Sequence, residues 1–274
     1  MVGAAATSIR TGAGVTSFRA DGAGPPLFLL HGLQVGQELF DGLRAHLTTS
    51  FTVITYDQRD RGETVFETSP YTTDDLADDL AALIQALGYA RAHVLGTSFG
   101  GMVAQAFALR HADLLGGLVL GATSQAPFRT ERTAGPVADL LVALAHGDEP
   151  RARATLAHLV PSAPSASPTE GASTHPDRGS GLMRRFGATH GFDTRGRLGE
   201  IVAPTLVIHG REDAAVPVAD ALSMVDEIPR ADALLLADCG HAWENERPAR
   251  AASAIASFLS DPRHPQTVPA LLDA

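Results

Sequence analysis

The stretch Gly96-Thr97-Ser98-Phe99-Gly100 decides the fold of this 274-residue chain. It matches the pattern Gly-x-Ser-x-Gly, in which a serine stands on a sharp turn between a strand and a helix. Such a match is not rare by composition alone, so a chance Gly-Ser turn is the alternative. The flanking sequence favours the sharp turn, because His93–Leu95 is strand-like and Gly101–Arg110 is helix-like. Side chains at the two glycines would collide with the neighbouring strand and helix. We therefore predict that Ser98 is an exposed nucleophile with strained backbone angles.

Strand-like and helix-like segments alternate on both sides of this motif. The strand-like segments are short and mostly apolar: Gly14–Phe18, Pro26–His31, Phe51–Tyr56, His93–Leu95, Leu114–Leu120, Thr205–His209 and Ala233–Leu236. The helix-like segments include Gln37–Leu47, Gly101–Arg110, Val218–Val225 and Ala249–Phe258. A further helix-like segment begins after Thr73, which we expect to be its N-cap, and ends at Gly88. Apolar strands separated by helices are typical of a parallel sheet covered on both faces. We predict an α/β fold with a mostly parallel central sheet.

The alternation is interrupted between residues 123 and 199. This part contains helix-like stretches at Val137–Ala145 and Arg151–Leu159, followed by Pro161–Gly181, which is rich in Pro, Ser, Ala and Gly and which we expect to be a mobile loop. We divide the chain into a first core part (1–122), an inserted lid (123–199) and a second core part with a C-terminal tail (200–274). A lid at this point covers the carboxyl ends of the strands, where open α/β sheets bind ligands.

The composition argues against several classes of protein. The net charge of −10 repels phosphate backbones, so we expect no nucleic-acid partner. The chain has no lysine, which excludes Schiff-base chemistry and a P-loop. Cys239 is the single cysteine, so no intrachain disulfide forms.

No apolar run is long enough for a signal peptide or a membrane span, and we expect a cytoplasmic protein that does not bind membranes. No metal-binding cluster or dinucleotide fingerprint appears, so we expect no metal and no cofactor. The sequence does not indicate an oligomeric state.

A serine nucleophile on such a turn takes its acid and its base from later in the chain, in the order Ser, Asp or Glu, His. His241 and His264 are the histidines that follow Asp213, and His264 lies in a proline-flanked tail. His241 follows a predicted strand, where loops carry functional groups, although a surface loop histidine is the alternative. Asp213 follows another predicted strand, from which its carboxylate can fix the imidazole tautomer and stabilise the imidazolium. Glu212 and Asp238 remain as rival acids.

The loop His31-Gly32-Leu33 follows the apolar strand that begins at Pro26. In this kind of site one oxyanion donor is a backbone N–H from that loop, and the other comes from the residue after the nucleophile. We therefore assign the N–H groups of Leu33 and Phe99, the latter at the positive end of a predicted helix. We expect His31 to brace the turn through hydrogen bonds rather than to act in catalysis.

Together these residues resemble the α/β-hydrolase superfamily. Within it, the chain looks like the lidded bacterial group that includes 3-oxoadipate enol-lactonases, aclacinomycin methylesterases and cofactor-free haloperoxidases. The resemblance covers nearly the whole chain and is specific for the fold and the triad, but weak for the substrate. Its marks are Leu30-His31-Gly32, Tyr56-Asp57-Gln58-Arg59, Gly96-Thr97-Ser98-Phe99-Gly100-Gly101, Ala203-Pro204-Thr205-Leu206-Val207-Ile208-His209-Gly210 and Gly240-His241, with Glu246 and Pro248 at positions that often follow the catalytic histidine.

The chain departs from the family pattern at several positions. Asp60, followed by Arg61, stands where the family usually has glycine. We expect both side chains in a solvated loop, with an Asp60–Arg61 charge pair near the sheet edge as the alternative. Leu33 stands where perhydrolase-like members tend to carry an aromatic residue, which weakens the peracid interpretation. Ser98 in place of aspartate argues against the chemistry of epoxide hydrolases and haloalkane dehalogenases.

We expect the lid to decide the substrate. Candidates for the substrate pocket are Gln34, Phe128, Phe186 and Trp243. Trp243 either lines the pocket or packs beneath its loop, and the sequence leaves both open. Arg184 and Arg185 are expected on a solvated helix face, with contact to an acidic substrate group as the alternative. The apolar inner face of the lid draws on Phe128, Leu140, Leu141, Leu144, Leu159, Val160, Leu182, Met183, Phe186 and Phe192, most of which we expect to hold the lid to the core.

The resemblance implies a serine hydrolase that cleaves an ester or lactone of a small to medium apolar substrate through an acyl-enzyme. Two other hypotheses stay open. The same triad serves C–C bond cleavage, perhydrolysis or a natural-product rearrangement in other members of the superfamily. A ligand receptor on this scaffold is the third hypothesis, because fold does not settle function.

Overall fold

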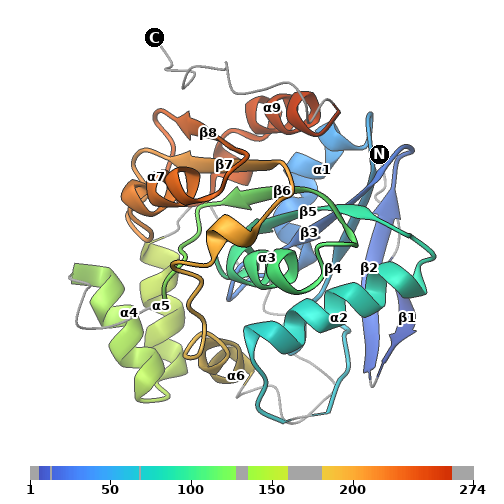
Figure 1. Ribbon diagram of the computed structural model, residues 1–274. Helices are drawn as coiled ribbons and strands as arrows, with labels where there is room; N and C mark the ends of the chain where they lie inside the picture. Colours follow the sequence, from blue (N-terminus) through green and yellow to red (C-terminus); the bar gives the residue numbers. More distant parts are fainter. Residues whose placement is uncertain (1–5, 13, 68, 128–134, 160–180, 261–274) are drawn as a thin grey trace.

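The computed structural model describes residues 6–12, 14–67, 69–127, 135–159 and 181–260. Its centre is an eight-stranded sheet with the strand order β1-β2-β4-β3-β5-β6-β7-β8 (Figure 1). The first three strands in this order pair antiparallel, and the pairs from β4 through β3 to β8 are parallel. The strands are β1 (Thr7–Thr11), β2 (Gly14–Asp21), β3 (Pro26–Leu30), β4 (Thr52–Tyr56), β5 (Ala92–Thr97), β6 (Leu115–Gly121), β7 (Thr205–Gly210) and β8 (Ala231–Leu236). The predicted α/β class is confirmed.

Helices cover both faces of the sheet (Figure 1). On one face, α2 (Thr73–Ala86), α3 (Phe99–Arg110) and α7 (Val218–Glu227) pack into one hydrophobic core. On the other, α1 (Asp41–Leu47) and α9 (Pro248–Ser260) pack into a second core. Consecutive residues of β3 alternate between the two, since Phe28 and Leu30 lie in the first core and Leu27 and Leu29 in the second. A strand buried on both faces therefore reads as a continuous apolar run.

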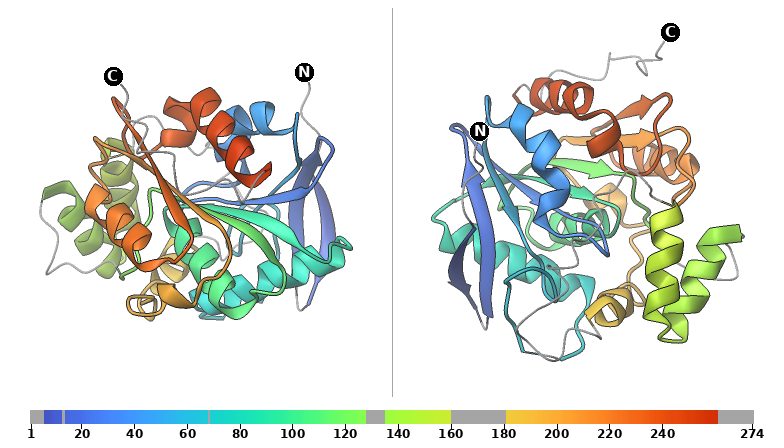
Figure 2. Two further views of the ribbon diagram at one scale, coloured as in Figure 1. Left: turned by 45° about the horizontal axis from the view of Figure 1, so that its top comes forward. Right: turned by 180° about the vertical axis from the view of Figure 1, so that it is seen from behind.

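The insertion between β6 and β7 carries three helices: α4 (Gly135–Ala145), α5 (Glu149–Leu159) and α6 (Gly181–Gly187). In both views of Figure 2, α4 and α5 lie at the opposite end of the molecule from the β1–β2 hairpin. Leu141, Leu144, Leu182 and Phe186 form a small core of their own, against which Leu33 of the β3–α1 loop packs. Leu159, at the end of α5, packs against Ala242. The inserted helices thus touch the loops that follow β3 and β8.

The N-cap of α2 is Thr72, so the assignment of Thr73 was wrong by one residue. Thr72 is extended, its hydroxyl accepts a hydrogen bond from the N–H of Asp75 at 3.2 Å, and the Asp75 carboxylate accepts from the N–H of Thr72 at 2.7 Å. This reciprocal capping box outweighs the single hydroxyl that Thr73 offers. Thr73 is instead the first helical residue and is buried. Gly88 follows the helix with φ +81°, which suits the predicted termination.

Several elements were not predicted from the sequence. They are the edge strand β1, helix α8 (Trp243–Glu246) and the short 3₁₀ helices Gln37–Phe40 and Leu198–Glu200, whereas for α6 a helix at Arg184 and Arg185 was expected without its bounds. The predicted helix Gln37–Leu47 is in fact a 3₁₀ turn followed by α1. The expected mobile loop Pro161–Gly181 falls, except for Gly181, outside the described residues. The tail with His264, and the lid positions Phe128 and Val160, also lie outside them.

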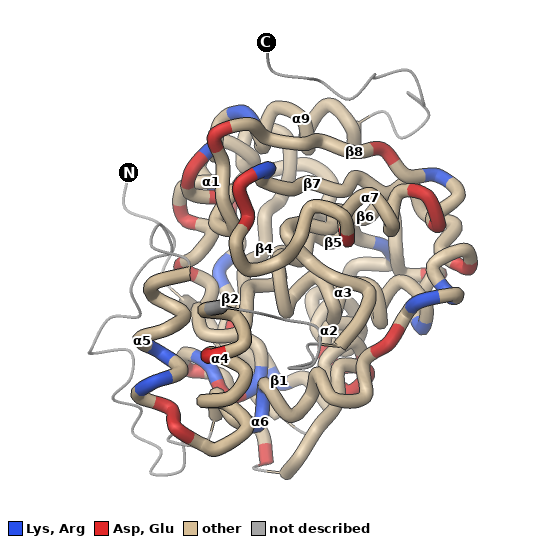
Figure 3. Tube along the Cα trace, turned by 90° about the vertical axis from the view of Figure 1, so that its left-hand side faces the viewer, with Lys and Arg blue, Asp and Glu red and all other residues tan. Residues whose placement is uncertain are grey.

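Acidic and basic residues are interspersed along the side of the molecule shown in Figure 3. Among the helices that the structure describes, none is long and apolar enough to cross a bilayer.

Candidate active site

Ser98 stands on the predicted turn between β5 and α3. Its backbone angles are φ 54° and ψ −120°, a region that non-glycine residues rarely adopt. A Cβ atom on Gly96 would lie 2.2 Å from the carbonyl oxygen of Gly100, and one on Gly100 would lie 2.1 Å from that of Leu30. Both glycines therefore allow backbones to approach closely, as the motif requires. Ser98 itself is half-buried, and its carbonyl accepts a hydrogen bond from the Thr123 hydroxyl at 2.7 Å.

Asp213 and His241 form a hydrogen-bonded pair on the loops after β7 and β8. Nδ1 of His241 lies 2.8 Å from Oδ2 of Asp213, whose side chain is fully buried. The other carboxylate oxygen accepts from the N–H groups of Ala215 and Val216 at 2.8 and 2.9 Å. Oδ2 also lies 3.2 Å from Nε2 of the buried His209. The carboxylate is thus held rigidly, in one orientation toward the imidazole.

The ionisation of this pair follows from its surroundings. Burial raises the pKa of Asp213, but the charge of His241 and the hydrogen bonds from His209, His241 and Val216 outweigh burial and hold that pKa well below its usual range. Burial lowers the pKa of His241, but the charge and hydrogen bond of Asp213, with Glu244 and Glu246 nearby, outweigh burial and raise it. Asp213 is an anion at neutral pH, and His241 is a stronger base than a free imidazole.

The sheet brings the candidate residues to one edge. Ser98, Asp213 and His241 follow β5, β7 and β8, and Leu33 follows β3. These strands are parallel, so their carboxyl ends share one edge, which is where open α/β sheets bind ligands. A Cβ atom on Gly32 would lie 3.7 Å from Cβ of Ser98, which puts the loop after β3 beside the serine.

The carboxylate of the rival acid Glu212 has another hydrogen-bond partner, since it accepts from the N–H of Cys239 at 2.7 Å. Glu246, which was not one of the rivals, accepts from the N–H of Gly240 at 2.7 Å. The carbonyl of Asp238 accepts from Arg247, and Asp238 has φ 48°. These contacts brace the loop that carries His241 from both sides. Of Glu212, Asp238 and Asp213, it is Asp213 whose carboxylate is hydrogen-bonded to the His241 ring.

His31 is fully buried and braces the turn, as expected. Its Nε2 accepts from the N–H of Gln58 at 3.1 Å, so Nδ1 carries the proton and donates to the carbonyl of Gly32 at 2.9 Å. Burial, aided by the positive charge of Arg185, lowers the pKa of His31 well below its usual value. The ring is therefore neutral, with the tautomer set by its two backbone partners.

The expectation of a solvated face for Arg184 and Arg185 was wrong. Arg185 has no exposed surface, and its guanidinium donates to the carbonyls of Gly32, Leu33 and Arg59. Nε of Arg184 donates to Asp60 at 2.9 Å, which also corrects the solvated loop expected for Asp60. Asp60 accepts from the hydroxyl of Tyr71 as well, at 2.8 Å. Both arginines point from α6 toward the core because backbone carbonyls and a carboxylate satisfy them there.

The pocket candidates have different surroundings. Gln34 is half-buried in the β3–α1 loop. Phe186 is 5% exposed and belongs to the small core of the insertion. Trp243 has no exposed surface, lies in the second core and donates from Nε1 to the Thr97 hydroxyl at 3.1 Å. Two roles were left open for Trp243, and its burial favours packing beneath its loop. The expectation that Trp243 lines the substrate pocket is corrected accordingly. Phe128 lies outside the described residues.

Glu244 is a buried carboxyl group that interacts electrostatically with His241, and sequence reasoning missed it. It is 3% exposed, and its Oε2 has no hydrogen-bond partner within the described part of the chain. Burial raises the pKa of Glu244 to about 7, partly offset by the hydrogen bond to its own backbone and by the charge of His241. The sequence offered one indication of this position, because Glu244 lies only three residues after His241. Among the described residues, no cluster of His, Cys, Asp and Glu is arranged to hold a metal ion.

Three similar proteins carry hydrolase, lactonase or esterase names. The chain is 27% identical over 251 residues to a putative carbamate hydrolase, RutD, of Agrobacterium fabrum, covering 88% of this chain and 95% of that protein. The structure of the enol-lactonase of Burkholderia xenovorans LB400 superposes with a TM-score of 0.76 at 25% identity, covering 93% of this chain and all of that one. A thermophilic esterase of Thermogutta terrifontis gives a TM-score of 0.77 at 27% identity, covering 94% and 98%. A family profile described as alpha/beta hydrolase fold matches residues 25–243. The chain therefore belongs to the alpha/beta hydrolase family.

Proposed function

We propose that the protein is a serine hydrolase that cleaves a carboxylic ester or lactone of a small to medium apolar substrate. The observation that carries this proposal is the buried Asp213–His241 pair, at 2.8 Å, on the same sheet edge as the strained Ser98. An ionised carboxylate on Nδ1 leaves Nε2 free to accept a proton, which is the arrangement that general-base activation of a serine requires.

In the proposed reaction, Ser98 Oγ attacks the carbonyl carbon while Nε2 of His241 takes the hydroxyl proton. The negative charge on the carbonyl oxygen is stabilised by the N–H groups of Leu33 and Phe99. The C–O bond then breaks, and His241 returns the proton to the leaving alkoxide, which departs as an alcohol. Water attacks the acyl-enzyme by the same steps, so that the products are the acid and the alcohol and Ser98 is regenerated. Asp213 remains ionised throughout.

We propose further that residues 123–199 act as a lid between the core parts 1–122 and 200–274. Two contacts support this division. The inserted helices pack against Leu33, a proposed oxyanion residue, and against Ala242, which follows the proposed base. A substrate that reaches Ser98 must therefore pass beside the insertion, which makes α4, α5 and α6 the elements that set its size and polarity.

The test is intact-mass analysis after treatment with a fluorophosphonate, followed by peptide mapping. One adduct on Ser98 is expected, absent from Ser98→Ala and strongly slowed in His241→Ala, whereas the exposed Ser223→Ala variant labels as the wild type does. Labelled protein is then compared with untreated protein on p-nitrophenyl esters, lactones and an aryl carbamate. A folded protein that does not react at Ser98 would contradict the proposal. Reaction at Ser98 without turnover of any of these substrates would instead favour a different reaction of the same nucleophile.

A further inference from the structure

The peptide between Gly32 and Leu33 is held on its carbonyl side by two donors. Nη2 of Arg185 donates to the Gly32 carbonyl oxygen at 2.9 Å, and Nδ1 of His31 donates to the same oxygen at 2.9 Å. The N–H of this peptide belongs to Leu33, the proposed oxyanion donor. One peptide unit thus carries a cation's hydrogen bond at one end and the proposed catalytic donor at the other.

The two ends of a peptide are coupled mechanically and electrically. In a trans peptide the C=O and N–H point in opposite directions within one plane, so fixing the oxygen fixes the direction of the N–H. A charge-assisted hydrogen bond to the oxygen also polarises the amide and strengthens its N–H as a donor. A donor that is already aimed needs no reorganisation when negative charge develops on the substrate oxygen.

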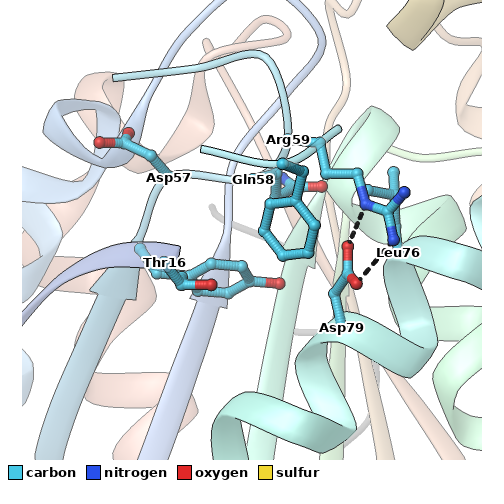
Figure 4. Close-up of a pocket in the computed structure, with 8 residues that line it drawn as sticks. Thr16, Asp57, Gln58, Arg59, Leu76 and Asp79 are labelled. Atoms are coloured by element: carbon cyan, nitrogen blue, oxygen red, sulfur yellow. Dashed lines mark hydrogen bonds and ion pairs between the residues drawn. The ribbon is translucent and has the colours of Figure 1, made fainter. Parts of the chain in front are cut away.

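Arg185 also contacts the neighbours of this peptide. Its Nε donates to the carbonyl of Leu33 at 2.8 Å, and Nη1 donates to the carbonyl of Arg59 at 3.0 Å. Arg59 is itself fixed to α2, where its guanidinium forms two hydrogen bonds with Asp79 at 2.6 and 2.8 Å (Figure 4). The Arg185 guanidinium lies 4.8 Å from the ring of Phe99, whose N–H is the second proposed donor. One side chain from the insertion therefore holds the loops after β3 and β4 together and touches both proposed oxyanion residues.

Arg185 remains charged in this place. Burial lowers the pKa of its guanidinium to about 10, which is still far above neutral pH. A buried cation is costly unless hydrogen bonds compensate it, and here three carbonyls do so. With no exposed surface, the guanidinium is directed at the protein backbone rather than at solvent.

We propose that Arg185 is a positioning residue that orients and polarises the Gly32–Leu33 peptide, so that the insertion controls the strength of the oxyanion hole. This inference rests on the proposed function, since it assigns a role within that site. The competing role is direct contact between Arg185 and an acidic group of the substrate.

The kinetic test compares Arg185→Met and Arg185→Lys with Arg184→Met, a matched control one residue away on α6. On neutral esters, Arg185→Met is expected to lower kcat by about 10- to 100-fold with KM changed by less than about 3-fold. This is below the loss of about 100- to 1000-fold that follows removal of a whole oxyanion donor. Arg185→Lys keeps the charge and is expected to recover part of kcat, and Arg184→Met is expected to stay within about 3-fold of wild type. An increase in KM confined to esters that carry a carboxylate, with kcat on neutral esters unchanged, would overturn the inference in favour of substrate contact.

A spectroscopic test separates this inference from the proposed function, because it needs no turnover. In protein labelled with ¹⁵N-leucine, Arg185→Met is expected to move the Leu33 amide proton upfield by about 0.3 ppm or more, since the amide loses its polarising partner. Arg184→Met is expected to leave that resonance in place. If the Met variant does not fold, the carbonyl ¹³C shift of Gly32 in the wild-type protein is read instead, and two donors predict a downfield position. An unmoved Leu33 amide, or a Gly32 carbonyl at its random-coil position, would overturn the inference even if ester hydrolysis is established.

Discussion

Nδ1 of His241 lies 2.8 Å from Oδ2 of Asp213, and this carboxylate has no exposed surface. Because the carboxylate of Asp213 raises the pKa of His241 above its ordinary value of 6.5, and because the base acts in its neutral form, activity should rise as pH increases through a midpoint above 6.5. Asp213→Asn removes the charge that raises this pKa, so the midpoint should move down and kcat should fall by about 1,000- to 10,000-fold.

Glu212→Gln is the matched control for this pH profile. It alters the adjacent carboxylate, which bonds to the N–H of Cys239 rather than to the imidazole. We expect a loss of less than about 10-fold in kcat and an unchanged midpoint. The measurement is kcat/KM between pH 5 and 9. A larger effect of Glu212→Gln than of Asp213→Asn would transfer the role of the acid to Glu212.

Glu244 should make the protein less stable as pH rises from about 4.5 to 7. Burial raises its pKa in the folded state to about 7 from 4.5, so over this range the folded state keeps a proton that the unfolded state has released. Stability falls with increasing pH wherever the folded state binds more protons. Glu244→Gln should therefore raise the free energy of unfolding at pH 8 by on the order of 2 kcal/mol and change it little near pH 4.5.

Urea unfolding of both proteins at the two pH values measures this difference. The exposed Asp226→Asn variant on α7 is the control, for which we expect no comparable gain at pH 8. An equal effect of Glu244→Gln at both pH values would mean that the carboxyl does not titrate in this range.

Gly96→Ala should be among the most destabilising single-methyl additions in the chain. The new Cβ would lie 2.2 Å from the backbone oxygen of Gly100, and neither backbone segment can move without displacing Ser98. We expect a loss of about 3 kcal/mol or failure to fold. Gly42→Ala is the contrasting change, because Gly42 lies in α1 and its added Cβ approaches nothing closer than 4.0 Å. It should stabilise the protein by about 0.5–1 kcal/mol, as judged by thermal unfolding.

Trp243, the single tryptophan, reports on the second core rather than on the substrate. It is fully buried and donates to the Thr97 hydroxyl, so its fluorescence should be blue-shifted and weakly quenched by acrylamide in the folded protein. Quenching should become strong only after unfolding in urea, and substrate analogues should not alter it. Strong quenching in the native state that a bound analogue removes would return Trp243 to the pocket wall.

The sequence was most informative where a chemical requirement restricts residue type, spacing and order. The two glycines around Ser98 and the chain order of Ser98, Asp213 and His241 led directly to residues that the sheet brings to one edge. Strands buried on both faces were also recognisable as apolar runs. By contrast, β1 has a mostly exposed pattern and is stabilised by pairing with β2, which no local signal reveals.

Arg185 shows why the insertion was harder to interpret. It was judged by the usual solvation of arginine, although it lies three residues after Leu182 and one before Phe186, on the face that α6 buries. Helical spacing alone could therefore have predicted its burial. Its partners could not have been predicted, because the carbonyls of Gly32 and Arg59 lie more than a hundred residues earlier in the chain.

The attachment of α6 to the core has a consequence for protein engineering. Arg184 and Arg185 tie α6 to Asp60 and to the loop after β3, whereas α4 and α5 meet the core through apolar packing at Leu33 and Ala242. Apolar contacts tolerate replacement by other residues of similar volume more readily than a network of directed hydrogen bonds does. A graft that exchanges α4 and α5 for helices from another family member, and that retains residues from Gly181 onward, should therefore change substrate preference while the catalytic framework of the recipient is kept.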